Sequence, residues 1–410
     1  AEVALEGIRV SNHSYGDPLG WTPNILGDGY WGWMGIPSIS EREDVSFGRY
    51  GQTAAIWDEI ADAAAHLVIV KSAGNERAAQ GPPDGAPHYV FDGGWQLQTT
   101  VRDADGGATG FDTIGDAGVA KNVITVGATA DAPWEIEGPA DVVMTSFSGW
   151  GPVDDGRIKP DLVANGTALM SSKAGGDAAY GASSGTSQAA PVVTGAVLLI
   201  QELWEQLFPG SVPLASTIKA LLIHSADEAG THPGPDYRFG WGHLNAERAA
   251  EHLKQAADAD RAAGPVRPYP AWVFEGAVGG GEVAEFEVAL AEASPMSATL
   301  VWTDPAGPVV VPLLDDPAAA LVHDLDLSVA QSGQVHLPWR LDLANPTMPA
   351  TKGINIRDNV EQVAFEARAG TLRIRVAAPE TLVGSEQRFS LVVGMPVDRP
   401  DASSTSYVSG

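Results

Sequence analysis

The sequence predicts an α/β domain with a parallel β-sheet, followed by a second domain built only from β-strands. Two observations predict the first domain: short β-branched runs such as 67–70 and 122–126 occur, and stretches with helical periodicity alternate with them. Strands that alternate with helices form parallel sheets, because each helix carries the chain back across the sheet. A third observation predicts the second domain, since beyond residue 271 the chain shows only short alternating runs separated by turn residues.

The α/β domain is expected to span residues 1–257. Its strands are expected at 8–14, 67–70, 122–126, 142–147 and 161–164, and its helices at 52–66, 187–207, 214–227 and 245–257. Two irregular insertions, 17–50 and 77–118, interrupt this pattern. The Trp-rich part of the first insertion, 21–33, either lines a substrate pocket or packs its aromatic side chains on one another.

The second domain is expected to be a β-sandwich or jelly roll over residues 271–396. A polar, Pro-rich linker at 258–270 precedes it, and a Ser-rich tail at 397–410, which we expect to be flexible, follows it. Its strands are expected at 283–290, 298–303, 325–329, 360–367, 371–377 and 389–393.

Composition excludes several classes of function. The net charge is −28, from 24 basic and 52 acidic residues, which argues against a nucleic-acid partner because phosphate binding needs basic patches. No run of about 18 apolar residues occurs, so no membrane-spanning helix is expected. Cysteine is absent, which excludes disulfides, cysteine catalysis and zinc–thiolate sites.

The segment Gly185–Pro191, with the sequence Gly-Thr-Ser-Gln-Ala-Ala-Pro, contains the strongest candidate for catalysis. Ser187 stands at the expected start of a long apolar helix, where free N–H groups and the helix dipole favour an oxyanion. Pro191 is expected in the first turn of this helix, where its missing N–H costs little. The alternative is that Ser187 only caps the helix.

Two further segments support a nucleophile. Asn75 follows a buried strand in Ser-Ala-Gly-Asn, and its carboxamide can donate to an oxyanion. Ser14-Tyr15-Gly16 ends another strand, whose backbone can pair with an extended peptide.

These segments, in this order, resemble those of the subtilases, the subtilisin-like serine proteases. The resemblance extends to 121–128, 147–161 and 237–245, and 300–304 and 321–327 resemble the C-terminal β-sandwich of two-domain bacterial subtilases. It implies a secreted or cell-surface endopeptidase of subtilisin-like fold that acts on polypeptides and needs no catalytic cofactor. It also implies roles for particular residues: Ser187 as nucleophile, Asn75 in the oxyanion hole, and Ser14, Tyr15, Gly16, Ser72, Ala73 and Gly74 along the substrate. In the sandwich, Asp304, Asp324 and Asp326 are candidate ligands of a structural calcium ion, or solvated acidic turn residues.

The family's mechanism also needs an aspartate and a histidine base, and no motif resembling the family's Gly-His-Gly-Thr-His is present. Of the nine histidines, only His88 is a candidate substitute base. We therefore expect the aspartate and histidine to come from an N-terminal fragment of the same precursor, held non-covalently. The alternatives are that the sequence is incomplete, or that the chain is a catalytically inactive scaffold or binding subunit.

Overall fold

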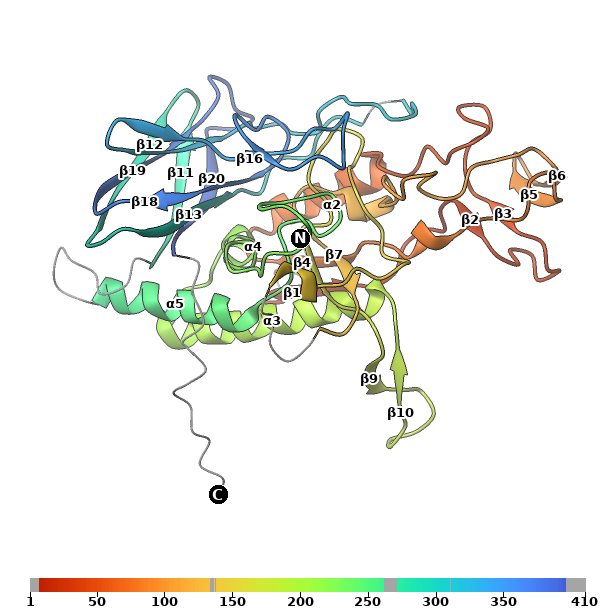
Figure 1. Cartoon of the computed structure of the whole chain (residues 1–410), viewed down its shortest axis with the longest axis horizontal. Coiled ribbons are helices and arrows are strands. Elements are labelled where there is room, and N and C mark those ends of the chain that lie inside the picture. Colours follow the sequence, from red (N-terminus) through yellow and green to blue (C-terminus); the bar gives the residue numbers. More distant parts are fainter. Residues whose placement is uncertain (1–6, 133–135, 137, 262–270, 310, 396–410) are drawn as a thin grey trace.

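The computed structural model describes residues 7–132, 136, 138–261, 271–309 and 311–395. An α/β domain lies beside a β-sandwich, and a small outlying sheet extends from the far end of the α/β domain (Figure 1). Most of the predicted linker 258–270 and the predicted tail 397–410 lie outside the described residues.

A four-stranded parallel sheet forms the centre of the α/β domain, as predicted. Its order is β1 (Val10–His13), β4 (Val68–Ser72), β7 (Ile124–Thr129) and β8 (Leu162–Asn165). Its two faces have separate hydrophobic cores. Val68 and Val70 belong to the core on the α3 side, whereas Ile69, between them, belongs to the core around α2. This alternation follows from the two-residue repeat of a strand that is buried on both faces.

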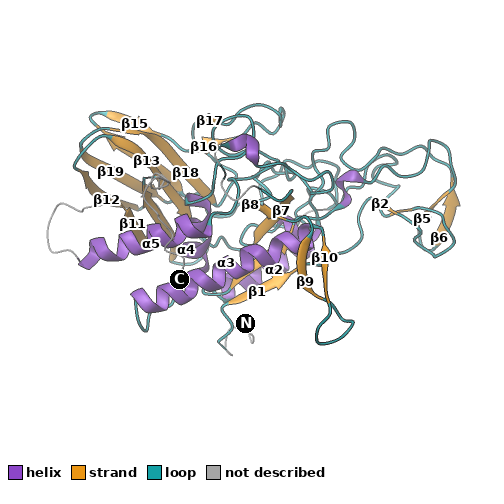
Figure 2. Cartoon of the chain, turned by 60° about the horizontal axis from the view of Figure 1, so that its bottom comes forward, coloured by secondary structure: helices purple, strands orange, loops and turns teal. Residues whose placement is uncertain are grey.

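Four α-helices surround this sheet within the described residues: α2 (Gln52–Ala63), α3 (Thr186–Leu207), α4 (Ala215–His224) and α5 (Ala246–Arg261). Figure 2 shows α3 and α5 as long helices that lie side by side. The short 3₁₀-helices are η1 (Glu76–Ala78), η2 (Asp116–Val119) and η3 (Pro139–Asp141). No helix in the described part of the chain is long and apolar enough to cross a membrane.

Two local predictions were wrong. Pro191 lies inside α3, beyond its first turn. Residues 142–147 do not form a strand: the N–H of Ala130 donates to the carbonyl of Val143, and a single bridge joins Met144 to Thr129. This segment reaches only the last residues of β7, because β4 and β8 already occupy the two edges of that strand.

The two predicted insertions combine into one outlying sheet, and a separate hairpin lies elsewhere in the α/β domain. The sheet contains β2 (Trp21–Thr22), β3 (Gly32–Trp33), β5 (His88–Phe91) and β6 (Trp95–Gln98). Trp21, Trp33 and Val90 form a small core of their own, which supports self-packing of the Trp-rich segment. The hairpin of β9 (Leu169–Ser172) and β10 (Tyr180–Ser183) projects from the α/β domain (Figure 1).

The C-terminal domain is a sandwich of two antiparallel four-stranded sheets, as predicted. One contains β11 (Ala271–Gly279), β20 (Glu386–Gly394), β13 (Ser294–Val301) and β18 (Val360–Ala367). The other contains β12 (Val283–Leu290), β19 (Gly370–Ala377), β14 (Asp326–Gln331) and β15 (Gln334–His336). A small ribbon of β16 (Trp339–Arg340) and β17 (Thr351–Lys352) adjoins them.

The sandwich packs closely on the α/β domain. Strands β13 and β20 contact α4, and β11 contacts α5. Val301, Val360 and Val392 of the sandwich belong to the hydrophobic core on the α3 face of the parallel sheet. The two domains therefore share buried apolar surface, which favours one fixed arrangement between them.

Candidate active site

Ser187 is the second residue of α3, and Gly185 precedes the helix with a φ of +149°. This conformation suits glycine, because other residues are strained there. The N–H of Thr186 donates to Asn75 Oδ1 over 2.8 Å, whereas the N–H of Ser187 has no partner among the described residues. A free N–H at a helix start is a ready donor for an oxyanion.

The carboxamide of Asn75 is fixed by Thr186. Its Oδ1 accepts the Thr186 N–H and, over 3.1 Å, the Thr186 hydroxyl, whose oxygen in turn accepts the N–H of Gly74. These bonds occupy the oxygen of the amide and leave its Nδ2 as a donor on an exposed side chain. The Asn75 side chain and the free N–H of Ser187 therefore both lie next to Thr186.

Two hydrogen bonds join Ser14 to Ser187 in both directions. The Ser14 hydroxyl donates to the carbonyl of Ser187 over 3.0 Å, and the Ser187 hydroxyl donates to the carbonyl of Ser14 over 3.3 Å. The Ser187 carbonyl is available because Pro191, four residues on, has no N–H to donate to it. Because Pro191 leaves this carbonyl free, Ser14, in the segment after β1, can bond to the start of α3.

A pocket of about 90 Å³ lies at the carboxyl ends of β1 and β4. Every residue that the sequence analysis assigned to catalysis or substrate binding lines it: Ser14, Tyr15, Gly16, Ser72, Ala73, Gly74, Asn75 and Ser187. The structure therefore brings together segments that lie about 170 residues apart in the chain. Ligand sites of parallel sheets commonly occur at this edge.

Four charged residues in the pocket wall, Asp17, Lys71, Glu76 and Asp116, were not predicted as site residues. Lys71 is 4% exposed, and its ammonium donates to the carbonyl of Ser72 over 3.0 Å. Burial lowers the pKa of Lys71, and the charges of Asp116 and Glu76 counteract that shift. Burial also raises the pKa of Glu76, which accepts the N–H of Asn75. A lysine directly after the apolar run 67–70 was the available signal in the sequence.

No histidine in the described part of the chain hydrogen-bonds Ser187. His88 is buried in the outlying sheet, where its ring bonds the carbonyl of Ala86 and the Nε of Arg102. His13 is nearer in sequence to Ser14, but its ring nitrogens face Ser11 and the Tyr15 hydroxyl. Neither histidine is placed to accept a proton from Ser187, so His88 is not a substitute base.

The three candidate calcium ligands of the sandwich do not converge on one point in the described structure. Asp304 is fully buried, pairs with Lys121 over 3.1 Å and accepts the N–H groups of Val322 and His323. Burial and the charges of Asp326 and Asp304 raise the pKa of Asp324 to about 6. Asp304 thus joins the domains, and calcium binding by these three residues stays a prediction.

Comparisons with known proteins identify similar sequences and structures. The model of the subtilase family matches residues 1–242, which is more than half of the chain. The chain is 29% identical over 216 residues to the serine protease/ABC transporter B family protein tagA of Dictyostelium discoideum, covering 46% of this chain and 12% of that protein. It is 31% identical over 152 residues to a C5a peptidase of Streptococcus pyogenes, covering 36% of this chain and 13% of that one. The chain thus spans about an eighth of the length of these relatives.

Among solved structures, the self-cleaved protease domain of PatA is 20% identical, with a TM-score of 0.38 over 62% of this chain and 64% of that one. A lanthipeptide protease is 17% identical, with a TM-score of 0.37 over 62% of this chain and 63% of that one. On the match of the family model, the chain belongs to the subtilase family.

Proposed function

We propose that this chain supplies the nucleophile and the oxyanion hole of a serine endopeptidase that hydrolyses peptide bonds. The observation that carries the proposal is that Ser187, Asn75 and Ser14 meet at one pocket. There the Ser187 hydroxyl lies near two possible donors: its own backbone N–H, which has no acceptor among the described residues, and the Asn75 carboxamide, which Thr186 orients. A side chain that only caps a helix does not need a second donor fixed by Thr186.

Each group has a distinct role in this proposal. Ser187 Oγ attacks the scissile carbonyl, and its proton passes to a histidine base. The Ser187 N–H and Asn75 Nδ2 hold the oxyanion that forms, which lowers the barrier because these donors are already oriented. The segments Ser14–Gly16 and Ser72–Gly74 lie on either side of the pocket and pair with the substrate backbone.

We further propose that the aspartate and the histidine come from an N-terminal fragment of the same precursor, which binds along β1. In the described structure β1 pairs only with β4, so its other edge carries free backbone donors and acceptors. Such an edge is normally paired or covered.

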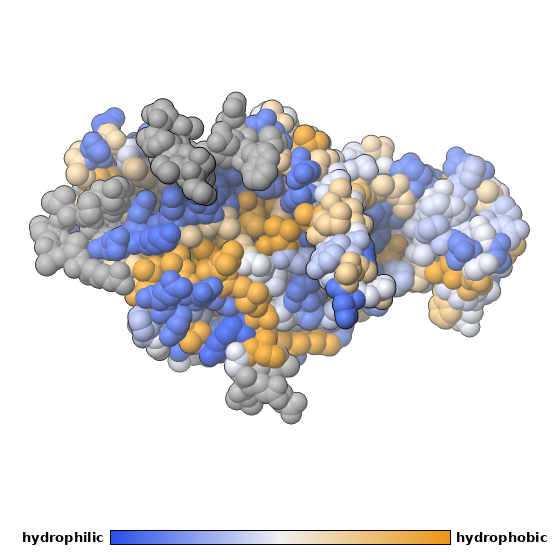
Figure 3. Space-filling model, turned by 90° about the horizontal axis from the view of Figure 1, so that it is seen from below, coloured by the Kyte–Doolittle hydropathy of each residue, from blue (hydrophilic) through white to orange (hydrophobic). Residues whose placement is uncertain are grey.

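The surface of α3 beside β1 supports this proposal. Thr194 bonds the side chain of Asn12, and Gln201 bonds the carbonyl of Arg9, so both mark the helix face that crosses β1. Leu198 lies between them on that face, four residues from one and three from the other, and is 53% exposed. Ile56 and Ile60 of α2 are also exposed, at 42% and 38%. Figure 3, which views the molecule from below, shows apolar surface gathered on the side where α3 lies.

A fluorophosphonate probe tests the nucleophile. We expect the native assembly to be labelled at Ser187, and labelling to disappear in Ser187→Ala but not in Ser184→Ala, an exposed serine nearby. Well-folded protein that is never labelled would support the rival, a scaffold that keeps the fold without catalysis.

Gel electrophoresis and N-terminal sequencing of the native sample test the fragment. We expect a smaller companion that carries an aspartate and a histidine motif. Leu198→Asp should weaken its association, whereas Leu97→Asp, at an equally exposed site on β6, should not. A native sample without such a companion excludes a separate fragment. Labelling of Ser187 in a sample without the companion would mean that only the fragment proposal fails. The histidine would then lie on the same polypeptide, and the catalytic proposal would stand.

The resemblance to secreted and cell-surface subtilases leads us to propose that the protein acts on polypeptides outside the cell or at its surface. Fractionation of the source cells with an antibody to this chain tests the location. Recovery of the chain only from the cytosolic fraction would contradict it.

A further inference from the structure

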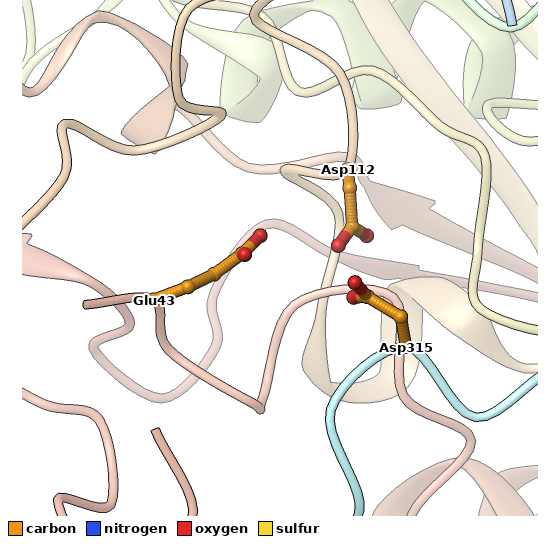
Figure 4. A group of neighbouring side chains, drawn as sticks. All are labelled: Glu43, Asp112 and Asp315. Atoms are coloured by element: carbon orange, nitrogen blue, oxygen red, sulfur yellow. The ribbon is translucent and has the colours of Figure 1, made fainter. Parts of the chain in front are cut away.

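Three carboxylates from distant parts of the chain converge beside the sandwich. Oxygens of Glu43, Asp112 and Asp315 all lie within 4.8 Å of one another. Figure 4 shows the three side chains pointing toward a common space, each from a different loop. Glu43 and Asp112 belong to the α/β domain, whereas Asp315 lies in the segment between β13 and β14 of the sandwich.

A fourth carboxylate, on Asp154, faces the same space. Asp154 is only 8% exposed, and neither of its carboxylate oxygens has a hydrogen-bond partner among the described residues; one buried oxygen of Asp112 also has none there. Both residues line the cavity of about 400 Å³ that Glu43 and Asp315 also line. Gly48 lies directly beneath, and a Cβ at that position would collide with an oxygen of Asp154 and an oxygen of Asp112. Buried carboxylate oxygens without donors are costly, so these orphaned oxygens point to a missing partner.

The local charges agree with this geometry. Burial, together with the charges of Asp154, Asp315 and Glu43, raises the pKa of Asp112 well above its usual value. Burial and Asp315 raise the pKa of Asp154 to about 8, and Arg49 only partly counteracts this. No lysine or arginine in the described residues forms an ion pair with these four carboxylates. The charges of these four carboxylates are therefore not balanced by nearby cations among the described residues.

We propose that Glu43, Asp112, Asp154 and Asp315 bind a calcium ion that joins the sandwich to the α/β domain. Calcium prefers six to eight hard oxygen ligands in flexible geometry, and it is the cation that suits an all-carboxylate set with room for waters. Backbone carbonyls of the adjoining loop 106–109, which also lines the cavity, and waters can complete the shell. Zinc is disfavoured because neither histidine nor cysteine lines the cavity. This site is distinct from the predicted one at Asp304, Asp324 and Asp326.

The test uses calcium alone on the intact protein after removal of metal with a chelator. In calorimetric titrations we expect the wild type to bind one more calcium equivalent than Asp112→Asn or Asp315→Asn. In thermal unfolding, calcium should raise the melting temperature of the wild type by several degrees and that of these variants by much less. Asp316→Asn, which alters the neighbouring residue, is the matched control and should respond like the wild type.

Two outcomes distinguish this site from a merely acidic cluster. In chelator, Asp112→Asn and Asp154→Asn should melt at or above the wild-type temperature, because a neutral amide removes repulsion; a folding defect would have the opposite sign. The proposal is overturned if Asp112→Asn and Asp315→Asn bind as many calcium ions as the wild type. It is also overturned if the calcium response disappears in Asp324→Asn and persists in Asp112→Asn, since the ion would then be in the sandwich.

Discussion

In this subtilase domain, the amino and carboxyl ends of the parallel strands differ in how their polar groups are bonded. At the amino ends the β-sandwich packs on the domain through buried ion pairs, such as that of Lys121 with Asp304. At the carboxyl ends the pocket around Ser187 keeps donors without partners, and the edge of β1 is unpaired in the described residues. Satisfied polar groups rigidify a junction, whereas unsatisfied ones are available to bind.

Lys121 is an example from the amino ends of the strands, which we call the closed end. It is fully buried just before β7, and its ammonium lies 3.1 Å from Asp304 of the sandwich and 3.6 Å from Asp58 of α2. It also donates to the carbonyls of Pro305 and Ala320, each over 2.8 Å. At the carboxyl ends, which we call the open end, the N–H of Ser187 and the Nδ2 of Asn75 line the pocket and have no acceptor among the described residues.

Removal of the nucleophile should give the largest effect and tests whether the open end is catalytic. In the assembly with its base, Ser187→Ala should lower kcat for a peptide substrate by about a million-fold, because the residual rate comes from binding and the oxyanion hole alone. Steady-state kinetics measure this, with Ser184→Ala as the control. An unchanged rate would mean that Ser187 has no catalytic role.

Removal of the central charge tests the closed end. Lys121→Met leaves Asp58 and Asp304 buried without their cation, and the free energy of unfolding should fall by about 3–5 kcal/mol. Urea unfolding measures this, and the double variant with Asp304→Asn should recover part of the loss. Arg373→Met removes an exposed pair with Glu287 and should change stability little. Equal effects of Lys121→Met and Arg373→Met would contradict the contrast between the two ends.

The oxyanion donor should have the next largest effect. Asn75→Ala should lower kcat about 10²- to 10³-fold with little change in KM, because the donor acts on charge that develops only in the transition state. Thr186→Ser keeps the hydroxyl that orients Asn75 and should retain most of the activity. A rise in KM with unchanged kcat would instead assign Asn75 to ground-state binding.

The open end could be predicted from sequence more fully than the closed end. Gly185–Pro191 and Ser72–Asn75 are short segments whose local patterns predict a turn, a helix start and a strand end. Parallel strands then place the ends of these segments at one edge. What Pro191 does was not predictable, because the partner of the freed Ser187 carbonyl is a hydroxyl 173 residues away.

The closed end depends on contacts that no local pattern contains. Lys121 and Asp304 stand 183 positions apart, and nothing around either residue indicates a buried pair. The carboxylates of Glu43, Asp112, Asp154 and Asp315 come from four separate loops, so only the tertiary structure brings them together. Strand β11 was also missed, although it pairs with β20 along its whole length and so anchors the sandwich beside α5.

A pair of histidines at the closed end gives the smallest of the expected effects. His224 and His252 are buried edge to face with ring centroids 4.7 Å apart, and His224 bonds Thr299 of the sandwich over 3.0 Å. Burial lowers the pKa of His252 to about 4, and burial, His252 and Arg248 lower the pKa of His224 well below its usual value. Both rings therefore stay neutral in the folded protein at pH values where they take up protons in the unfolded chain.

The sign of the pH dependence follows from this difference. Between about pH 6.5 and 4 the unfolded chain binds more protons at these sites than the folded chain, so stability is lost as the pH falls through this window. His252→Asn keeps a polar group without a titrating ring, and it should flatten the dependence of the melting temperature on pH between these values. His232→Asn, at an exposed site, should leave the dependence unchanged. If His252→Asn left the slope as it is, the acid sensitivity would arise elsewhere and the closed end would owe its stability to its ion pairs rather than to neutral histidines.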